Sequence, residues 1–304
     1  MKGAFDMHYS SVAIIVVTYN RKDLLTECIT AILNSDYQYY ELFVIDNAST
    51  DGTKKELSYY WMHEKVHYIN TGENLGGAGG FNYGLKNTGI EKYQYAWIMD
   101  DDTIVNSDTL TNFVSYCDEH ENVGFVTGKV LWKDASFCTM NVPKINKWKR
   151  VSKFDEKQRV QYASFVSLFV CVDVIKELGL PYKEFFIWGD DWEYTRRISK
   201  RYDCVYLPNC IVTHKCVSNA GADIVNCAKD RVDRFKYMYR NDVVLYRQDG
   251  FEGYWYLFIR TILHTIRILF KTKENKSNKL KIMYQSLVRG FSFKPDVEYV
   301  GKEN

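Results

Sequence analysis

The 304-residue sequence has little net charge, no paired-cysteine motif and no long hydrophobic run. A formal net charge of +2 argues against a nucleic-acid-binding protein, because such domains usually carry a concentrated basic surplus. The eight cysteines show no CxxC pair and no Cys/His zinc spacing, so we expect buried thiols in a reducing, cytoplasmic compartment. The apolar run at residues 12–17 is too short for a signal sequence or a membrane span.

Strand and helix signals alternate through the first hundred residues and predict a parallel α/β sheet. Strands are expected at residues 11–17, 41–47, 65–70 and 95–102. The first strand leads into a segment with helical spacing, for which Asn20 is the expected N-cap. We expect one α/β domain over residues 1–245 and a helical, basic extension over residues 246–304.

Three adjacent carboxylates, Asp100, Asp101 and Asp102, follow an apolar strand. Ligands of open α/β sheets bind at the carboxyl ends of strands, and alternation along the chain sends Asp100 and Asp102 to the same side. Two hard oxygen donors can hold Mg²⁺ or Mn²⁺, and such a cation can neutralise a diphosphate leaving group. The alternative interpretation is a solvated acidic turn.

A second acidic cluster, WGDDWE, spans residues 188–193 and precedes a predicted helix. A carboxylate among aromatic side chains suits a general base, because partial desolvation raises its pKa. The alternative is helix N-capping by Asp190 or Asp191. His214 follows a predicted strand, and a lone histidine is more often structural than a metal ligand, so residue type alone leaves its role open.

Six ordered segments resemble the family 2 glycosyltransferases with an A-type nucleotide-sugar-binding fold. They are VVTYNR (16–21), VIDNASTDGT (44–53), NLGGAGGFNYGL (74–85), WIMDDDT (97–103), FFIWGDDWEYTRR (185–197) and the isolated His214. The resemblance spans about residues 12–245 and is specific through order and spacing. It implies a mixed, mainly parallel central sheet flanked by helices. The first strand–helix turn lacks the GxGxxG fingerprint of a dinucleotide oxidoreductase.

Carried over residue by residue, the resemblance implies a donor site, a metal site, a base and an acceptor side. The implied donor-binding residues, with Asp46 on the uracil or thymine ring, are Thr18, Asn20, Arg21, Asp46, Asn74, Gly76, Gly77, Gly80, Asp100 and Asp101. The implied ligands of Mn²⁺ or Mg²⁺ are Asp100, Asp102 and His214, and the implied catalytic base is Asp191. The acceptor-side candidates are Trp188, Asp190, Trp192 and Arg240.

The resemblance also implies an inverting displacement, in which Asp191 takes the proton of an acceptor hydroxyl. Residues 74–88 are most similar to galactofuranosyltransferases using UDP-galactofuranose, and residues 179–197 are similar to rhamnosyltransferases using dTDP-rhamnose. The chain is short for a galactofuran polymerase, so we expect transfer of one or few sugars to a lipid-linked or polysaccharide acceptor, as in capsule or O-antigen synthesis. A sugar nucleotidyltransferase and a noncatalytic glycan-binding module are the rival classes.

The C-terminal extension contains YWYLFIRTILHTIRILF at residues 254–270. Helical spacing places Arg260, His264, Arg267 and Lys271 on one face. A basic amphipathic helix rich in aromatics can lie in a membrane interface, at the inner face of the cell membrane in this case. Packing on the catalytic domain or on a second subunit is the equal alternative.

Overall fold

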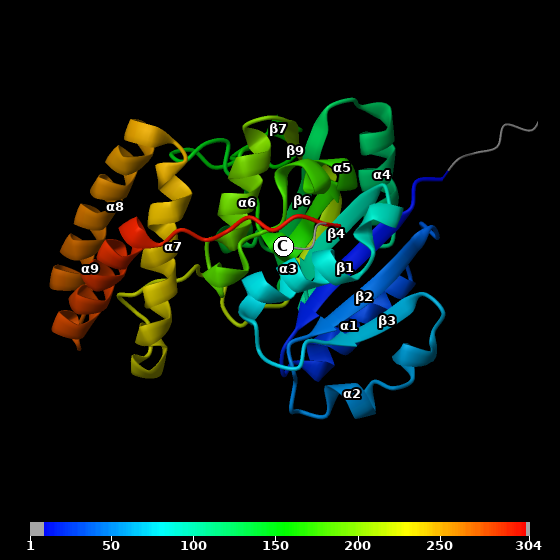
Figure 1. The fold of residues 1–304 in the computed structure, drawn as a ribbon, viewed down its shortest axis with the longest axis horizontal. Helices are drawn as coiled ribbons and strands as arrows, with labels where there is room; N and C mark the ends of the chain where they lie inside the picture. Colours follow the sequence, from blue (N-terminus) through cyan, green and yellow to red (C-terminus); the bar gives the residue numbers. More distant parts are fainter. Residues whose placement is uncertain (1–8, 302–304) are drawn as a thin grey trace, which may run out of the picture.

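The computed structural model describes residues 9–301, in which nine strands form one sheet with helices on both faces (Figure 1). The strand order is β3-β2-β1-β4-β8-β6-β9-β5, and β7 pairs with β9. The strands are β1 (Val12–Thr18), β2 (Tyr40–Asp46), β3 (Val66–Asn70), β4 (Tyr95–Asp100), β5 (Thr103–Val105), β6 (Val123–Trp132), β7 (Gln158–Arg159), β8 (Leu168–Cys171) and β9 (Asp203–His214).

Strands and α-helices alternate from β1 to β4, and the last three α-helices come in succession after β9. They are α1 (Lys22–Leu33), α2 (Thr53–Glu56), α3 (Gly76–Asn87), α4 (Thr109–Glu119), α5 (Val172–Leu178), α6 (Asp190–Ser199), α7 (Phe235–Arg247), α8 (Gly250–Lys271) and α9 (Lys276–Ser292). Short 3₁₀ turns lie at η1 (Tyr60–Met62), η2 (Ile90–Lys92), η3 (Thr139–Asn141), η4 (Phe165–Ser167), η5 (Lys183–Phe185) and η6 (Lys229–Arg234).

The half of the sheet formed by β3, β2, β1 and β4 is parallel, as the strand and helix signals predicted. Beyond β4 the sheet is mixed, because β8 runs antiparallel to both β4 and β6, while β6 and β9 are parallel. The strand order reverses between β1 and β4, and such a reversal opens a crevice at the carboxyl ends of the strands.

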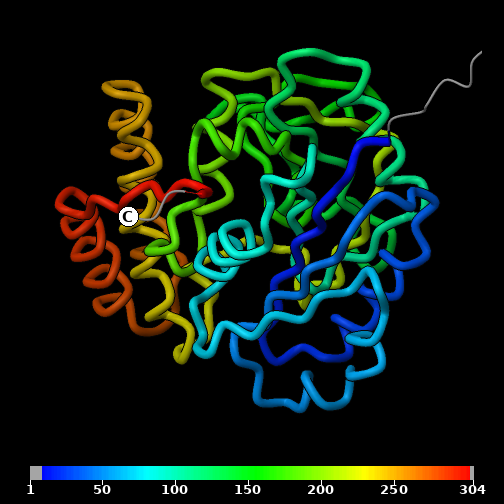
Figure 2. The backbone as a smooth tube through the Cα atoms, turned by 45° about the vertical axis from the view of Figure 1, so that its right-hand side comes forward, coloured from blue at the N-terminus to red at the C-terminus, as the bar shows by residue number. Residues whose placement is uncertain are grey.

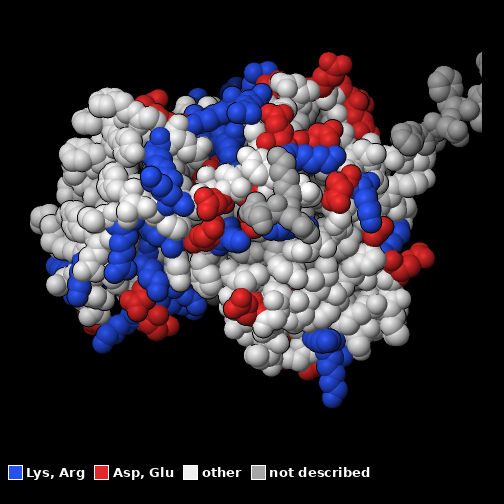
Figure 3. Space-filling model, in the orientation of Figure 1, with Lys and Arg blue, Asp and Glu red and all other residues white. Residues whose placement is uncertain are grey.

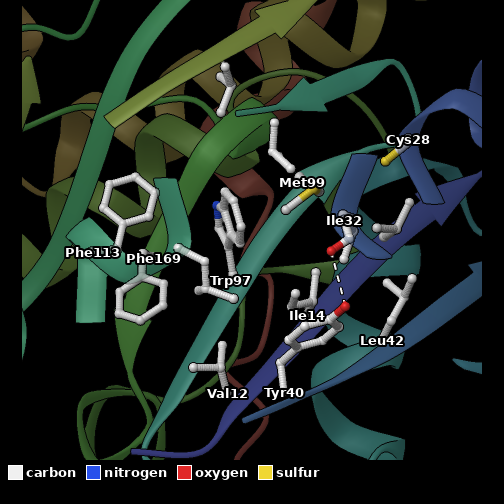
Figure 4. Packing of buried hydrophobic residues seen from close by; sticks show 14 of the residues in the cluster. Val12, Ile14, Cys28, Ile32, Tyr40, Leu42, Trp97, Met99, Phe113 and Phe169 are labelled. Carbon is white, nitrogen blue, oxygen red and sulfur yellow. Dashed lines mark hydrogen bonds between the residues drawn. The ribbon is translucent and has the colours of Figure 1, made fainter. Parts of the chain in front are cut away.

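Both faces of the central strands are buried, which explains the continuous apolar runs in the sequence. Alternate residues of β1 enter two different clusters: Val12 and Ile14 pack on the side of α1 and α4, whereas Ala13 and Ile15 pack on the opposite side. Figure 4 shows the first cluster, where Trp97 packs edge-on against Phe113 with ring centroids 5.5 Å apart. These two layers fix the strand ends that carry the acidic run.

Helix α1 is not capped by Asn20, contrary to the sequence-based expectation. The helix begins at Lys22, whose backbone N–H donates to Asp51 Oδ2 at 3.2 Å. Asn20 instead has φ 54° and accepts a hydrogen bond from the Thr50 backbone at its Oδ1. The cap comes from the loop after β2, so the loops that follow two neighbouring strands are tied together.

Helices α7, α8 and α9 pack together at one side of the sheet domain (Figures 1 and 2). The chain after α9 runs back toward the sheet domain, where Glu298 pairs with Lys86 at 2.7 Å and Lys183 at 3.1 Å. No helix within residues 9–301 has the combination of length and apolar character that crossing a bilayer requires.

Candidate active site

The crevice between β1 and β4 brings the first and fourth predicted segments into contact. Thr18 at the end of β1 donates its hydroxyl to Asp101 Oδ2 at 2.7 Å. Arg21, just beyond Thr18, reaches Asp102 Oδ2 at 2.8 Å and Asp101 Oδ1 at 3.3 Å. Asp101 therefore faces β1, on the other side of the chain from the two aspartates that flank it.

Asp100, Asp102 and His214 form a cluster in which one potential ligand atom from each residue lies within 4.8 Å of the others. Antiparallel pairing of β5 with β9 places His214 opposite Thr103 and so next to the acidic run. The sequence-based expectation that Asp100 and Asp102 point to the same side is confirmed.

The donor set of this cluster fits a divalent cation. Asp102 Oδ1 is buried and has no hydrogen-bond partner among residues 9–301, although His214 Nε2 lies only 3.0 Å away. Two carboxylates and an imidazole nitrogen are ligands that Mn²⁺ accepts, and the carboxylates also suit Mg²⁺. A cation bound here would take the place of the direct contact between this oxygen and the His214 nitrogen.

The ionisable groups of the cluster act on one another's pKa values. Burial and the neighbouring Asp102 raise the pKa of Asp100 to about 6. Burial opposes the ionisation of Asp102, but His214 and Arg21 lower its pKa overall. Burial lowers the pKa of His214, and the Asp102 carboxylate outweighs it and raises the value to about 10. A proton on His214 and a metal cation would therefore compete for the same carboxylate.

Asn141 orients His214, and sequence reasoning missed this residue. Its Oδ1 lies 2.8 Å from His214 Nδ1 and also accepts from Cys138 Sγ at 2.9 Å, while its Nδ2 donates to Ser164 Oγ at 2.9 Å. An acceptor at Nδ1 favours the tautomer that leaves Nε2 bare toward Asp102. No local motif marks Asn141, because it lies 73 residues from His214.

All eight cysteines are free, and five of them are buried, in line with the expectation from their spacing. Three-dimensional contact nevertheless creates a group that spacing could not reveal, since Cys138, Cys216 and His214 also place one ligand atom each within 4.8 Å of one another. Cys138 Sγ lies on the Nδ1 side of the imidazole, 3.8 Å from that nitrogen.

The loop before α6 is held in an unusual conformation at the mouth of the site. Phe186 and Trp188 have φ values of 64° and 65°, which cost free energy for residues with side chains. The buried Asn241 amide donates to the carbonyl of Trp188 at 2.8 Å and to that of Phe185 at 3.0 Å. Arg240 donates to the Glu184 carbonyl at 2.6 Å. Arg240 and Asn241 of α7 therefore hold the loop of residues 184–188 in place through hydrogen bonds to its backbone carbonyls.

Asp190 and Asp191 begin α6, and they differ in access to solvent. Asp190 is buried, whereas Asp191 is partly exposed and accepts a hydrogen bond from the Trp192 backbone at 2.7 Å. Burial and the adjacent Asp190 charge raise the pKa of Asp191 well above its usual value. Asp100 also acts on that pKa, so the second acidic cluster lies near the first. The N-cap residue of α6 is Gly189, and Asp191 satisfies one N–H of the first turn from inside the helix.

The glycine-rich segment NLGGAGG opens α3 and packs it against the site. Gly76 has φ +72°, and a Cβ there would lie 2.2 Å from the Phe186 carbonyl oxygen. A Cβ on Gly80 would lie 2.6 Å from the Val17 side chain. A Cβ on Gly77 would meet nothing within 4 Å. Gly76 and Gly80 thus serve close packing, and Gly77 faces open space.

Several other predicted site residues have protein partners in the structure. Asp46 is fully buried, and its carboxylate accepts from the Ser49 backbone at 2.8 Å and from the Tyr68 hydroxyl at 2.5 Å. Asn74 Oδ1 accepts from the Gly76 backbone at 2.9 Å. The predicted contacts of Asp46 with a nucleobase and of Arg240 with an acceptor stay predictions.

Residues 13–176 match the family described as glycosyl transferase family 2. The glycosyltransferase AglE of Haloferax volcanii is 26% identical over 209 residues, which cover 67% of this chain and 66% of that protein. The galactofuranosyltransferase GlfT1 of Mycolicibacterium smegmatis is 24% identical over 204 residues, 63% of this chain and 66% of that protein. The chain thus aligns with just under two-thirds of the length of each relative.

Solved structures resemble this chain over most of its length. TarS 1–349 of S. aureus in complex with UDP has a TM-score of 0.56 and 16% identity, covering 93% of this chain and 72% of that one. The mannosyltransferase PcManGT of Pyrobaculum calidifontis, in complex with GDP-Man and Mn²⁺, has a TM-score of 0.57 and 16% identity, covering 97% and 80%. At these identities the likeness concerns the fold.

Proposed function

The chain belongs to glycosyl transferase family 2 and has the A-type fold, and on that premise we propose that it is an inverting, metal-dependent glycosyltransferase. The observation that carries this proposal is the convergence of Asp100, Asp102 and His214 beside Asp191 at the carboxyl ends of the strands. This arrangement supplies a cation site and a carboxylate of raised pKa, which a displacement at a sugar carbon needs.

In the proposed reaction, Asp191 takes the proton from an acceptor hydroxyl as the oxygen bonds to the anomeric carbon. The bond from that carbon to the diphosphate oxygen breaks on the opposite side, so the configuration inverts. A divalent cation held by Asp100, Asp102 and His214 would supply positive charge for the departing diphosphate. Asn241 would help to hold Asp191 in place, because its amide binds the carbonyls of Phe185 and Trp188 in the loop just before α6.

We propose a uridine or thymidine diphosphate sugar as the donor, bound at the β1 to β4 crevice. Support comes from the similarity to a TarS structure that contains UDP and to a galactofuranosyltransferase. Galactofuranose is therefore our first candidate, and rhamnose from dTDP-rhamnose is the alternative suggested by residues 179–197. The proposed acceptor is a hydroxyl of a lipid-linked or polysaccharide glycan.

A donor panel tests this function. UDP-galactofuranose, dTDP-rhamnose and other nucleotide sugars are incubated with the protein and Mn²⁺ or Mg²⁺, and release of UDP or TDP is measured with and without acceptor glycans. We expect turnover of one donor class, loss of it in EDTA, and loss of it in Asp102→Ala. Full turnover in EDTA would refute the metal role, and consumption of sugar phosphate with a nucleoside triphosphate would identify a nucleotidyltransferase instead.

Helix α8 is oriented in an unexpected way. Its polar side chains face the protein: Arg260 pairs with Asp242 at 3.0 Å, Arg267 pairs with Asp223 at 3.0 Å, and His264 lies 2.9 Å from the Tyr239 hydroxyl. Burial and the two arginines lower the pKa of His264 to about 3, so this residue carries no charge at neutral pH. The polar side chains of the predicted basic face thus have partners within the protein, although the Arg267 side chain keeps 42% exposure and Lys271 is exposed.

The solvent-facing side of α8 is largely apolar instead, and Figure 3 shows a largely uncharged surface over this helix. On α9, exposed apolar side chains are interspersed with the exposed Lys281, Gln285 and Arg289. The large exposed apolar side chains of the two helices, which we call the apolar face, are Phe251, Tyr254, Trp255, Phe258, Ile262, Leu263, Ile266, Leu269, Phe270, Tyr284, Val288 and Phe291. Contiguous patches of this kind mark membrane or protein contacts. We propose that residues 246–304 bind the membrane surface through this face, next to a lipid-linked acceptor.

A further inference from the structure

Lys144 is a buried cation without a polar partner. It is 7% exposed, and within residues 9–301 its ammonium forms neither a hydrogen bond nor an ion pair. Its nearest partner is an aromatic ring, since Nζ lies 3.6 Å from the centroid of Trp192 and 5.9 Å from that of Tyr162. A buried charge normally has an ionic partner, so the arrangement points to one supplied by a ligand.

The position of Lys144 is fixed by its backbone. Its N–H donates to the Tyr162 carbonyl at 2.9 Å, and its own carbonyl accepts from Gln161 at 2.8 Å and from Tyr162 at 3.2 Å. These bonds hold the residue beside the strand-like segment that leads to β8. The ammonium is therefore presented from a rigid site, which suits recognition of a ligand.

The surroundings of Lys144 carry an excess of positive charge. Burial, then Arg260 and Arg150, lower its pKa to about 7, against weaker opposing effects of Asp242 and Asp191. Asp242 is already paired with Arg260, and Asp191 has a raised pKa. Asp242 and Asp191 thus act on Lys144 from a distance, and no described carboxylate forms a direct ion pair with its ammonium.

Lys144 lies beside the proposed base, because Trp192 directly follows Asp191 and donates its backbone N–H to that carboxylate. Trp192 is one of the acceptor-side candidates that the sequence offers, and Lys144 Nζ lies over its ring. On the premise of the proposed function, the ammonium therefore belongs to the acceptor side of Asp191.

We propose that Lys144, over the face of Trp192, binds an anionic oxygen group of the acceptor, a phosphate or a carboxylate, close to the hydroxyl that receives the sugar. The proposal rests on the proposed function, in which Asp191 is the base. Lysine binds phosphate and carboxylate oxygens as a point charge, and an anion here would restore the missing partner. The acceptor would then be a phosphate-containing or uronic-acid-containing glycan.

The first test uses inorganic phosphate and acetate as probes. The Cε resonance of Lys144 is followed by NMR in ¹³C-lysine-labelled protein and assigned by its absence in Lys144→Met. We expect saturable binding of one or both anions that moves the titration of Lys144 to higher pH. Lys147→Met is the matched control, because Lys147 is buried nearby but already pairs with Asp249 and Glu252. Absence of any anion-dependent shift would overturn the proposal.

The second arm distinguishes the acceptor from the donor diphosphate as the source of the anion. The titration is repeated with the protein saturated with UDP and Mn²⁺. Retained phosphate binding supports an acceptor site, whereas a Lys144 shift caused by UDP itself, with loss of phosphate binding, would overturn it. Unchanged UDP affinity and melting temperature in Lys144→Met show that the variant folds, and Lys144→Arg should retain anion binding. Donor hydrolysis by the wild type tests the proposed function separately.

Discussion

Asp190 and Asp191 are adjacent in the sequence, yet only Asp191 combines a raised pKa with access to solvent. If it is the base, Asp191→Asn should lower transfer by about 10²–10⁴-fold, the usual contribution of a positioned proton acceptor. Donor affinity, measured by calorimetry, should survive, because the crevice is built from other segments. Asn keeps nearly the same volume, so near-normal transfer would move the assignment to Asp190 or Glu193.

Asn141 allows a test of the metal site through a residue that contacts the proposed ligand His214 but is not itself a proposed ligand. Asn141→Ala removes the acceptor from His214 Nδ1, so the ring is free to turn or to change tautomer. We expect Mn²⁺ affinity, measured by electron paramagnetic resonance, to fall by about 10–100-fold, with activity recovered at high Mn²⁺. Asn141→Asp, which keeps an oxygen acceptor, is the matched control and should lose less. Equal affinity in Asn141→Ala and the wild type would show that His214 needs no such support.

At the scale of elements, Asp249 joins three parts of the chain. Its side chain is 4% exposed at the start of α8 and pairs with Arg196 of α6 at 2.6 Å and with Lys147 at 3.4 Å. Asp249→Asn would leave Arg196 without its carboxylate and Lys147 with Glu252 alone, and breaking a buried ion pair typically costs about 3–5 kcal/mol of unfolding free energy. Asp155→Asn is the control, since Asp155 is 92% exposed in its pair with Lys129 and should cost less than about 1 kcal/mol.

The ion pair between Asp249 and Arg196 also predicts that the free energy of unfolding depends on pH. Burial opposes ionisation of Asp249, but Arg196 and the nearby lysines lower its pKa overall. A lowered native pKa stabilises the fold above the unfolded pKa of about 3.9, and this contribution is lost as pH falls through the native value. The difference between wild type and Asp249→Asn, measured by urea unfolding, should stay constant from about pH 7 to 5 and shrink below about pH 4. A difference that grows on acidification would contradict this sign.

At the scale of the whole molecule, the apolar face of α8 and α9 predicts membrane binding that does not depend on charge alone. Replacing the exposed and mutually stacked Trp255 and Phe258 by serine should weaken binding to neutral and anionic vesicles by at least about tenfold, because each buried aromatic contributes about 1.5–3 kcal/mol. Tyr59→Ser, at 76% exposure on the sheet domain, is the control. Unchanged vesicle binding together with a changed oligomeric state would assign the face to a second subunit.

Local patterns in the sequence determined the parallel half of the sheet, the order of its strands along the chain and the place of the acidic run. Continuous apolar strands and helical spacing are properties of neighbouring residues, and they leave few topologies for β1 to β4. The family and its fold followed from the order of six segments. The division at residue 245 stays a proposal.

Only the tertiary structure decided which side chains complete the site. The cap of α1 by Asp51, the contact of Asn141 with His214 and the position of Lys144 beside Trp192 each join residues far apart in the chain. Helical spacing correctly grouped the polar side chains of α8, but it could not say that Arg260 and Arg267 face carboxylates of the protein. Periodicity defines the faces of a helix, whereas the partners available in the folded chain decide which face is buried.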